Sequence, residues 1–175
     1  RQDVNVSVTG GTRVEIKGVA HLTWAPELTH NEMFRQVALL KIASLLNDRA
    51  DRSQWHITHH ELDDERLIDA VKKLGGAPQD KHQVIAVNLP QFAGVPSFFT
   101  QPGKAFENEI ADRLKVIPCL ERPNMLSSED LDDRSDDALW TEVRKCLKAA
   151  SDDAQLIFWA PEADVETALE TIEER

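Results

Sequence analysis

The chain of 175 residues carries 31 acidic and 20 basic side chains, giving a formal net charge of −11 at pH 7, and 41% of its residues are hydrophobic. This balance is typical of a water-soluble globular protein with enough length to bury a core, and it argues against a surface broadly attractive to DNA or RNA phosphates. No run of about eighteen apolar residues is present to span a membrane. The N-terminus is a polar strand rather than a signal peptide, and it opens in mid-strand without Met, so we expect a piece of a longer polypeptide.

Residues 1–19 have the pattern of a β-hairpin. Apolar residues alternate with polar ones on both sides of a glycine pair: Val4, Val6 and Val8 precede Gly10-Gly11, and Val14 and Ile16 follow it. Side chains alternate across a strand, so the polar ones share a face. That face comprises Asp3, Asn5 and Ser7 from the first strand and Arg13, Glu15 and Lys17 from the second. It could bind a metal, a phosphate or an ammonium group, although the pattern alone favours an ordinary hairpin with a solvated face.

A long helix is predicted next, from about residue 27 to 47, because apolar residues recur at spacings of three and four. Its run of adjacent apolar residues predicts burial on more than one side. Residues 47–60 are polar without a clear period and predict a linker. A helix over 63–74 is then indicated by a cap at Asp63 or Asp64 and by Gly75-Gly76 at its end.

The remaining chain alternates short apolar runs with helical patterns. Strands are predicted over 84–87, 97–100, 117–120 and 154–160, and helices over 105–115, 137–150 and 164–174. An acidic loop lies between, flanked by Asp132-Asp133 and Asp136-Asp137. Cys119 and Cys146 lie in no metal-ligand spacing and suit a reducing cytosol as free, buried thiols. The order of elements predicts an α+β protein in which the C-terminal part is a two-layer unit, an antiparallel sheet with helices on one face.

The first nineteen residues closely resemble a signature of the E subunit of archaeal-type glutamyl-tRNA(Gln) amidotransferase. The resemblance rests on three blocks: Arg1-Gln-Asp-Val-Asn-Val-Ser7, Gly10-Gly11, and Arg13-Val-Glu-Ile-Lys-Gly-Val19. A related block occurs in the B subunit of the bacterial-type enzyme. The following helix also resembles the family at Glu32, Arg35-Gln36, Leu39-Leu40 and Ile42.

From about residue 83 onward the chain contains four short motifs: Leu89-Pro-x-Phe-x-Gly94, Gln101-Pro-Gly-Lys-x-Phe106, Glu109-Ile-Ala-Asp112 and Asp152-Asp-Ala154. In these motifs it resembles the GAD domain, a module shared by the amidotransferase E subunit and bacterial-type aspartyl-tRNA synthetase. The chain departs from the family at Phe106-Glu-Asn-Glu109 and at Cys119–Met125, which suggests a divergent member. The resemblance divides the chain into the edge of a cradle-shaped catalytic domain (1–50), a linker with a connecting helix (51–80) and a GAD-like domain (81–175).

The resemblance implies a cytoplasmic carbon–nitrogen ligase that converts misacylated Glu-tRNA(Gln) to Gln-tRNA(Gln). ATP would activate the glutamyl γ-carboxylate, and ammonia would come from a glutaminase partner, the D subunit of the same enzyme. Such chemistry needs Mg²⁺ and cations near the phosphate oxygens. The residues then expected to be catalytic are Glu15, Asp3 and Lys17, with Arg13 and Asn5 binding substrate or phosphate and with Glu15 and Asp3 as metal ligands. The 175 residues by themselves are expected to be inactive.

Two other functions are open. The departures from the family pattern would also suit a divergent binding or scaffold module without amidotransferase activity. An aspartyl-tRNA synthetase piece is disfavoured, because that enzyme shares the GAD module but not the Arg13–Val19 block.

Overall fold

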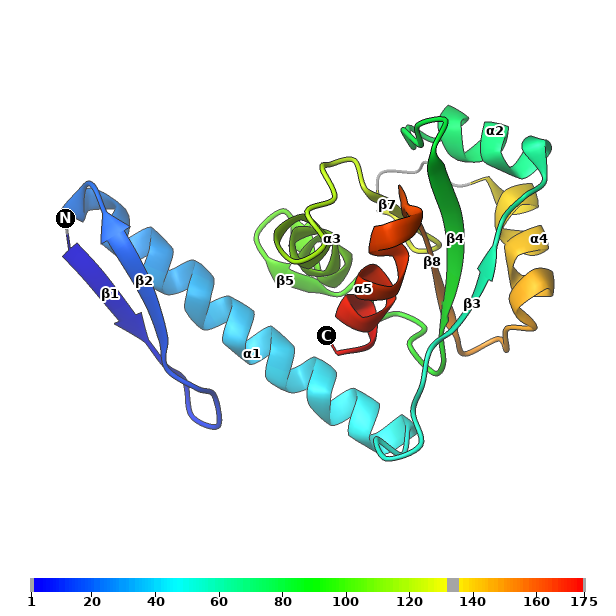
Figure 1. Ribbon diagram of the computed structural model, residues 1–175. Helices are drawn as coiled ribbons and strands as arrows, with labels where there is room; N and C mark the ends of the chain where they lie inside the picture. Colours follow the sequence, from blue (N-terminus) through cyan, green and yellow to red (C-terminus); the bar gives the residue numbers. More distant parts are fainter. Residues whose placement is uncertain (1, 132–135, 175) are drawn as a thin grey trace.

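The N-terminal hairpin forms as the alternating pattern predicts (Figure 1). The computed structural model describes residues 2–131 and 136–174, so the predicted Asp132-Asp133 pair of the acidic loop lies outside the described residues. Strands β1 (Gln2–Val6) and β2 (Val14–Val19) pair antiparallel, with Val4 opposite Ile16 and Val6 opposite Val14. Two strands alone are marginally stable in water, so this hairpin depends on what it packs against.

Helix α1 (Ala25–Arg49) is the longest element and follows a short 3-10 turn, η1 (Leu22–Trp24). Pro26 occupies its first turn, where a missing N–H leaves no hydrogen bond unmade. The helix runs between the hairpin and the C-terminal part of the molecule (Figure 1). The prediction of burial on more than one side is confirmed in part: the helix packs on both the hairpin and the C-terminal core, but Met33, Phe34 and Val37 are each more than 40% exposed. One side contacts the hairpin, one side reaches the C-terminal core through Ile42, and the remainder faces outward.

The C-terminal part is built on a four-stranded antiparallel sheet of strand order β3-β4-β8-β7. The strands are β3 (Thr58–Glu61), β4 (His82–Leu89), β7 (Met125–Ser127) and β8 (Ala154–Pro161). The two central strands pair over their whole length, from His82 opposite Pro161 to Leu89 opposite Ala154. A separate small ribbon is formed by β5 (Phe99–Gln101) and β6 (Lys104–Ala105).

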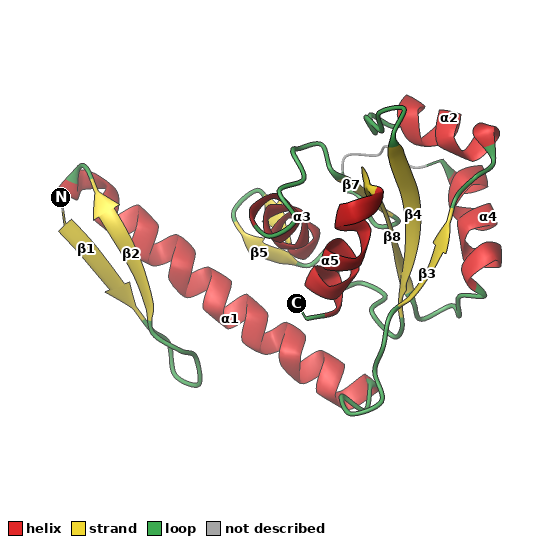
Figure 2. Cartoon of the chain, viewed as in Figure 1, coloured by secondary structure: helices red, strands yellow, loops and turns green. Residues whose placement is uncertain are grey.

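Helices cover both faces of this sheet (Figure 2). They are α2 (Glu65–Lys73), α3 (Phe106–Val116), α4 (Asp137–Leu147) and α5 (Glu162–Glu173). On one face, α3 and α5 bury Leu114 and Ile172 against Leu156 and Phe158 of β8. On the other face, α2 and α4 bury Val71, Leu139 and Val143 against Ile157 and Trp159, the alternate residues of the same strand.

The α+β class, the hairpin, the long helix and the antiparallel sheet are confirmed. The detail of helices on one face is wrong, since the unit has three layers rather than two. The reason is the composition of β4 and β8, which are apolar on successive residues and are buried almost throughout. A strand that is apolar on both sides must be covered on both sides.

Three local predictions are also corrected. Part of the segment predicted as a linker is β3, an edge strand that pairs with β4 from Thr58 opposite Asn88 to Glu61 opposite Ile85. The strand predicted over 117–120 does not form, because Cys119 adopts a left-handed backbone with φ of 58° next to Pro118. The short β7 takes that place in the sheet. Cys119 and Cys146 are free thiols as expected, but both are exposed rather than buried.

Within the described part of the chain, none of the helices combines the length and apolar character that a membrane crossing requires.

Candidate functional site

The polar face of the hairpin gathers three of the five predicted site residues. The strand register places Asn5 directly opposite Glu15. Lys17, two residues further along β2 on the same face, forms an ion pair with Glu15, with 3.2 Å between Nζ and Oε2. The Glu15 and Lys17 side chains are 37% and 73% exposed, so both are open to a ligand from solution.

The other two predicted residues lie at the margins of this group. Asp3 is exposed, and its Oδ1 accepts a hydrogen bond of 2.9 Å from the backbone N–H of Gly18. This bond lies where the strand pairing shifts register, between Gln2 and Val4, so the carboxylate stabilises an irregular end of the ladder. Arg13 is exposed and lies just before β2, at the opposite end of the face.

The donor set of this face is suited to a hard cation or to a phosphate. Glu15 and Asn5 offer neighbouring oxygen atoms, Lys17 offers positive charge on β2, and Arg13 offers it just before that strand. Among residues 2–131 and 136–174, no group of three or more His, Cys, Asp or Glu side chains is arranged to hold a metal ion. The oxygen atoms of Glu15 and Asn5 form a partial set of ligands. Mg²⁺ commonly takes one or two carboxylates and completes its shell with water and substrate phosphates, so a partial set fits that ion.

Gln36 of α1 holds the hairpin to the helix. Its Oε1 accepts from the N–H of Val8 at 3.1 Å, and its Nε2 donates to the carbonyl of Val6 at 3.2 Å. The same Nε2 donates to Oε1 of Glu32 at 2.9 Å, one turn earlier on the helix. Gln36 is only 6% exposed. The amide thus replaces water at one backbone group at the end of β1 and one in the segment that follows, and it fixes the hairpin against α1.

The neighbouring residue, Arg35, holds α1 to the C-terminal unit. Its Nε and Nη2 donate to the two carboxylate oxygens of Glu109 on α3, at 2.7 and 2.8 Å. Glu109 is 7% exposed. The hydrogen bond to Glu109 is the main cause that raises the pKa of Arg35 above its usual value, and it outweighs burial, which acts in the opposite direction. The family resemblance drew attention to Arg35-Gln36 as a motif but gave neither residue a partner, because the partners lie far away in the sequence.

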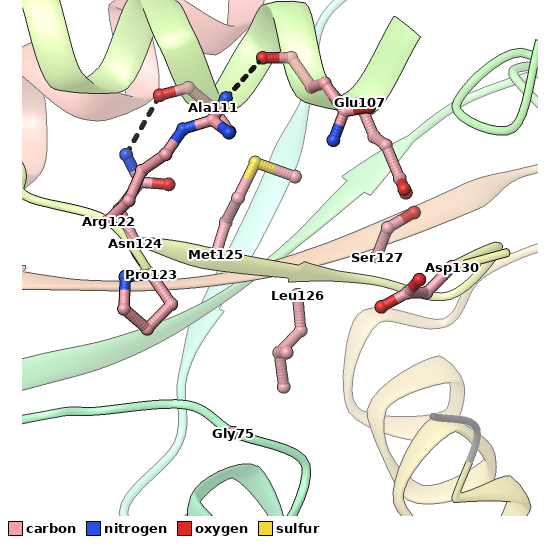
Figure 3. Close-up of a pocket in the computed structure, with 11 residues that line it drawn as sticks. Gly75, Glu107, Ala111, Arg122, Pro123, Asn124, Met125, Leu126, Ser127 and Asp130 are labelled. Carbon is pink, nitrogen blue, oxygen red and sulfur yellow. Dashed lines mark hydrogen bonds between the residues drawn. The ribbon is translucent and has the colours of Figure 1, made fainter. Parts of the chain in front are cut away.

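A separate polar pocket of about 390 Å³ lies in the C-terminal unit, between α3 and β7 (Figure 3). Two of the polar side chains that line it are bonded to other groups of the protein. Arg122 donates to the Asn108 carbonyl at 2.8 Å and pairs with Asp112 at 2.9 Å, and Asn124 donates to the Ala111 carbonyl at 2.9 Å. The Oδ1 atom of Asn124 has no hydrogen-bonding partner within the described residues, but it is buried away from solvent. The pocket is built largely from the segments where the chain departs from the expected family pattern and from their neighbours, and sequence reasoning did not find it.

Comparison with known proteins shows which family the chain resembles along its length. Known protein-family models give no match to the chain. Curated relatives match it over its whole length. The E subunit of glutamyl-tRNA(Gln) amidotransferase from Pyrococcus furiosus is 32% identical over 185 residues, which cover 98% of this chain and 27% of that protein. Its counterpart from Methanocaldococcus jannaschii is 33% identical over 190 residues, covering 100% of the chain and 28% of the relative. The one from Thermococcus gammatolerans is 39% identical over 122 residues, covering 66% and 18%.

The fold and the hairpin define an α+β protein with an exposed polar face held on a long helix. The similarity along the whole chain makes it a homologue of the E subunit of glutamyl-tRNA(Gln) amidotransferase. The chain spans 27–28% of the length of these relatives where it is matched in full.

Proposed function

We propose that this chain contributes part of the active site of a tRNA-dependent amidotransferase. The observation that carries the proposal is the whole-length similarity to relatives named as the E subunit of glutamyl-tRNA(Gln) amidotransferase. The exposed face of Asn5, Glu15 and Lys17 supports it, because these side chains offer oxygen ligands and positive charge on one surface of the hairpin.

The reaction proposed in detail is the conversion of Glu-tRNA(Gln) to Gln-tRNA(Gln). An oxygen of the glutamyl γ-carboxylate attacks the terminal phosphorus of ATP, and ADP leaves. Ammonia released from glutamine by a glutaminase partner, the D subunit, then attacks the activated carbonyl carbon. The bond from that carbon to the phosphate oxygen breaks, phosphate leaves and the nitrogen loses a proton, which yields the side-chain amide. Charge accumulates on phosphate oxygens in the first step, so positioned cations and oxygen ligands are what the protein must supply.

Glu15 is the first choice for a residue that touches the reacting groups, followed by Asp3 and Lys17. Glu15, with Asp3 as second carboxylate, would hold Mg²⁺, which neutralises phosphate charge when bound. Lys17 would orient an anionic oxygen of the substrate, and its ion pair with Glu15 keeps its ammonium group at that position until a ligand arrives. Arg13 would bind phosphate from the other end of the face, and the Asn5 amide would orient substrate opposite Glu15.

The sheet unit has a different proposed role. We assign residues 81–175 to a GAD-like module that braces the enzyme or a neighbouring chain rather than reacting. The net charge of −11 favours this role over tight binding of tRNA by the unit itself. The reaction is proposed to take place in the cytoplasm.

The test is an assay of the complete polypeptide that contains this chain, reconstituted with its glutaminase partner. Formation of Gln-tRNA(Gln) from Glu-tRNA(Gln) is measured with ATP, Mg²⁺ and glutamine, and again with ammonium chloride replacing glutamine. We expect product with either nitrogen source, and we expect it to require ATP with both. The glutaminase partner should be needed with glutamine but not with ammonium chloride. No product under either condition would reject the amidotransferase function in favour of a divergent binding module.

A further inference from the structure

A continuous line of polar contacts crosses the molecule from the hairpin to the C-terminal unit. It starts at the Val8 N–H, passes through the amide of Gln36 to Glu32, and continues to Arg35, whose Nη1 lies 3.6 Å from Oε1 of Glu32. It ends at the two-pronged contact of Arg35 with Glu109. The line thus connects the hairpin, α1 and α3, and its longest link is the 3.6 Å contact between Arg35 and Glu32.

This line is much less exposed than the other ion pairs of α3. Glu109 and Glu32 have side chains 7% and 11% exposed, and Arg35 is 24% exposed. Asp112, one turn after Glu109 on the same helix, is 52% exposed and pairs with Lys104 and Arg122 on the surface. Exposed pairs of that kind contribute little to stability, while the parallel hydrogen bonds between a guanidinium and a carboxylate are directional.

The apolar packing between α1 and the C-terminal unit does not by itself fix the orientation of α1. Ile42, Leu45 and Leu46 of α1 join the core formed with α3 and α5. Such contacts are non-directional and tolerate small rotations and shifts of a helix about its axis. A buried ion pair is in turn a poor source of stability compared with apolar side chains of similar volume, so its use here needs another explanation. Fixing one orientation of α1 is the explanation that the geometry offers.

We propose that Arg35 and Glu109 are positioning residues that set the orientation of the hairpin's polar face relative to the C-terminal unit. Gln36 carries this orientation from α1 to the hairpin. The inference rests on the proposed function, because it states how the face bearing Glu15 is presented to the rest of the active site. It also makes a structural claim that holds without any activity: the hairpin has one orientation only while the two-pronged contact is intact.

The structural claim is tested by electron paramagnetic resonance distance measurements on the complete polypeptide. One spin label is attached at Thr9→Cys in the hairpin turn and the other at the exposed Cys146 of α4, with the other exposed cysteines replaced by serine. The distance distribution is expected to be narrow in this background. It is expected to become at least twice as wide in Glu109→Gln and in Arg35→Lys. Arg35→Lys keeps the positive charge but cannot form the two parallel hydrogen bonds to Glu109. If Glu109→Gln does not fold, the distance distribution of Arg35→Lys decides the structural claim.

The matched control is Asp112→Asn, which removes two exposed ion pairs from the same helix. It should leave the distribution unchanged. A distribution in both Glu109→Gln and Arg35→Lys as narrow as that of the control would overturn the inference.

The catalytic part is tested by kinetics on the same variants. Misorientation of a reacting face lowers kcat, by about tenfold to a hundredfold for shifts near 1 Å, and leaves binding of the distant parts of the tRNA intact. We expect that fall in kcat with KM for Glu-tRNA(Gln) unchanged within about twofold. Broadened distances with an unchanged kcat would overturn the positioning role. An inactive parent enzyme would reject the proposed function, while the distance measurements would still decide the structural claim.

Discussion

Replacing Gln36 with alanine should release the hairpin from α1. The change removes both backbone contacts of this side chain, from the Val8 N–H at 3.1 Å and to the Val6 carbonyl at 3.2 Å. A net contribution of about 0.5–1.5 kcal/mol for each hydrogen bond gives a loss of about 2 kcal/mol in the stability of the docked hairpin. At about 1.4 kcal/mol for each factor of ten, that loss is a roughly thirtyfold increase in the population of the undocked state. The C-terminal sheet has apolar cores of its own on both faces and should keep its stability.

Native-state hydrogen exchange measures this directly. The amide of Val8 and those of β1 should exchange about thirtyfold faster in Gln36→Ala, while those of β4 and β8 should be unaffected. Ser44→Ala, an exposed change further along α1, is the matched control. Gly11→Ala offers a second route to the same contact, since a Cβ there would lie 2.8 Å from Oε1 of Gln36. If hairpin exchange in Gln36→Ala equals that of Ser44→Ala, the hairpin is held by something else and the reasoning fails.

Three further predictions concern the C-terminal unit. Phe158→Ala should lower the free energy of unfolding by about 3–5 kcal/mol in urea denaturation, because this ring is fully buried under α3 and α5; a loss below about 1 kcal/mol would contradict the packing described. Gly76→Ala should destabilise the end of α2, since a Cβ would lie 2.6 Å from the Val71 side chain, and thermal melting should show a lower midpoint than in wild type. The Arg66 side chain and backbone lower the pKa of Asp64, so the contribution of this cap is complete above the ordinary value of about 3.9 and is lost as pH falls through the lowered value; an NMR titration of Asp64 that gave the ordinary value would contradict this.

Much of the fold follows from local patterns. The helices were predictable from their apolar spacing and from caps such as Asp64, which accepts from the Arg66 N–H as a helix cap should. The central strands were predictable from their apolar runs. Those runs also carried the signal for a three-layer unit, because β8 is apolar at consecutive residues from Leu156 to Ala160 rather than at every second one.

Other parts depend on partners that are distant in the sequence. Strand β3 reads Thr-His-His-Glu and is fully exposed, so neither hydrophobicity nor alternation marks it as a strand. It becomes one only because the edge of β4 is available for pairing. Over 117–120 the apolar residues suggested a strand, but the left-handed backbone at Cys119 turns the chain away before β7 begins.

The candidate site shows the same division. Alternation and the hairpin register bring Asn5, Glu15 and Lys17 together as the pattern predicted. The bond from Gly18 to Asp3 was not predictable, because it depends on a register irregularity. The contact between Arg35 and Glu109 joins residues 74 apart in the sequence, and only the packing of α1 against α3 reveals it.

The central claim is that the polar face of the hairpin takes part in ATP-dependent amidation. Single-turnover formation of Gln-tRNA(Gln) by Glu15→Gln, in the complete polypeptide with the proposed glutaminase partner, tests this claim most directly. Glu142→Gln, which removes an exposed carboxylate from α4, is the control. We predict a fall of about a hundredfold for Glu15→Gln, the scale expected when a group that stabilises transition-state charge is lost, and no change for Glu142→Gln. Equal rates in the two variants, with both folded, would contradict the claim and leave Glu15 as part of a solvated surface.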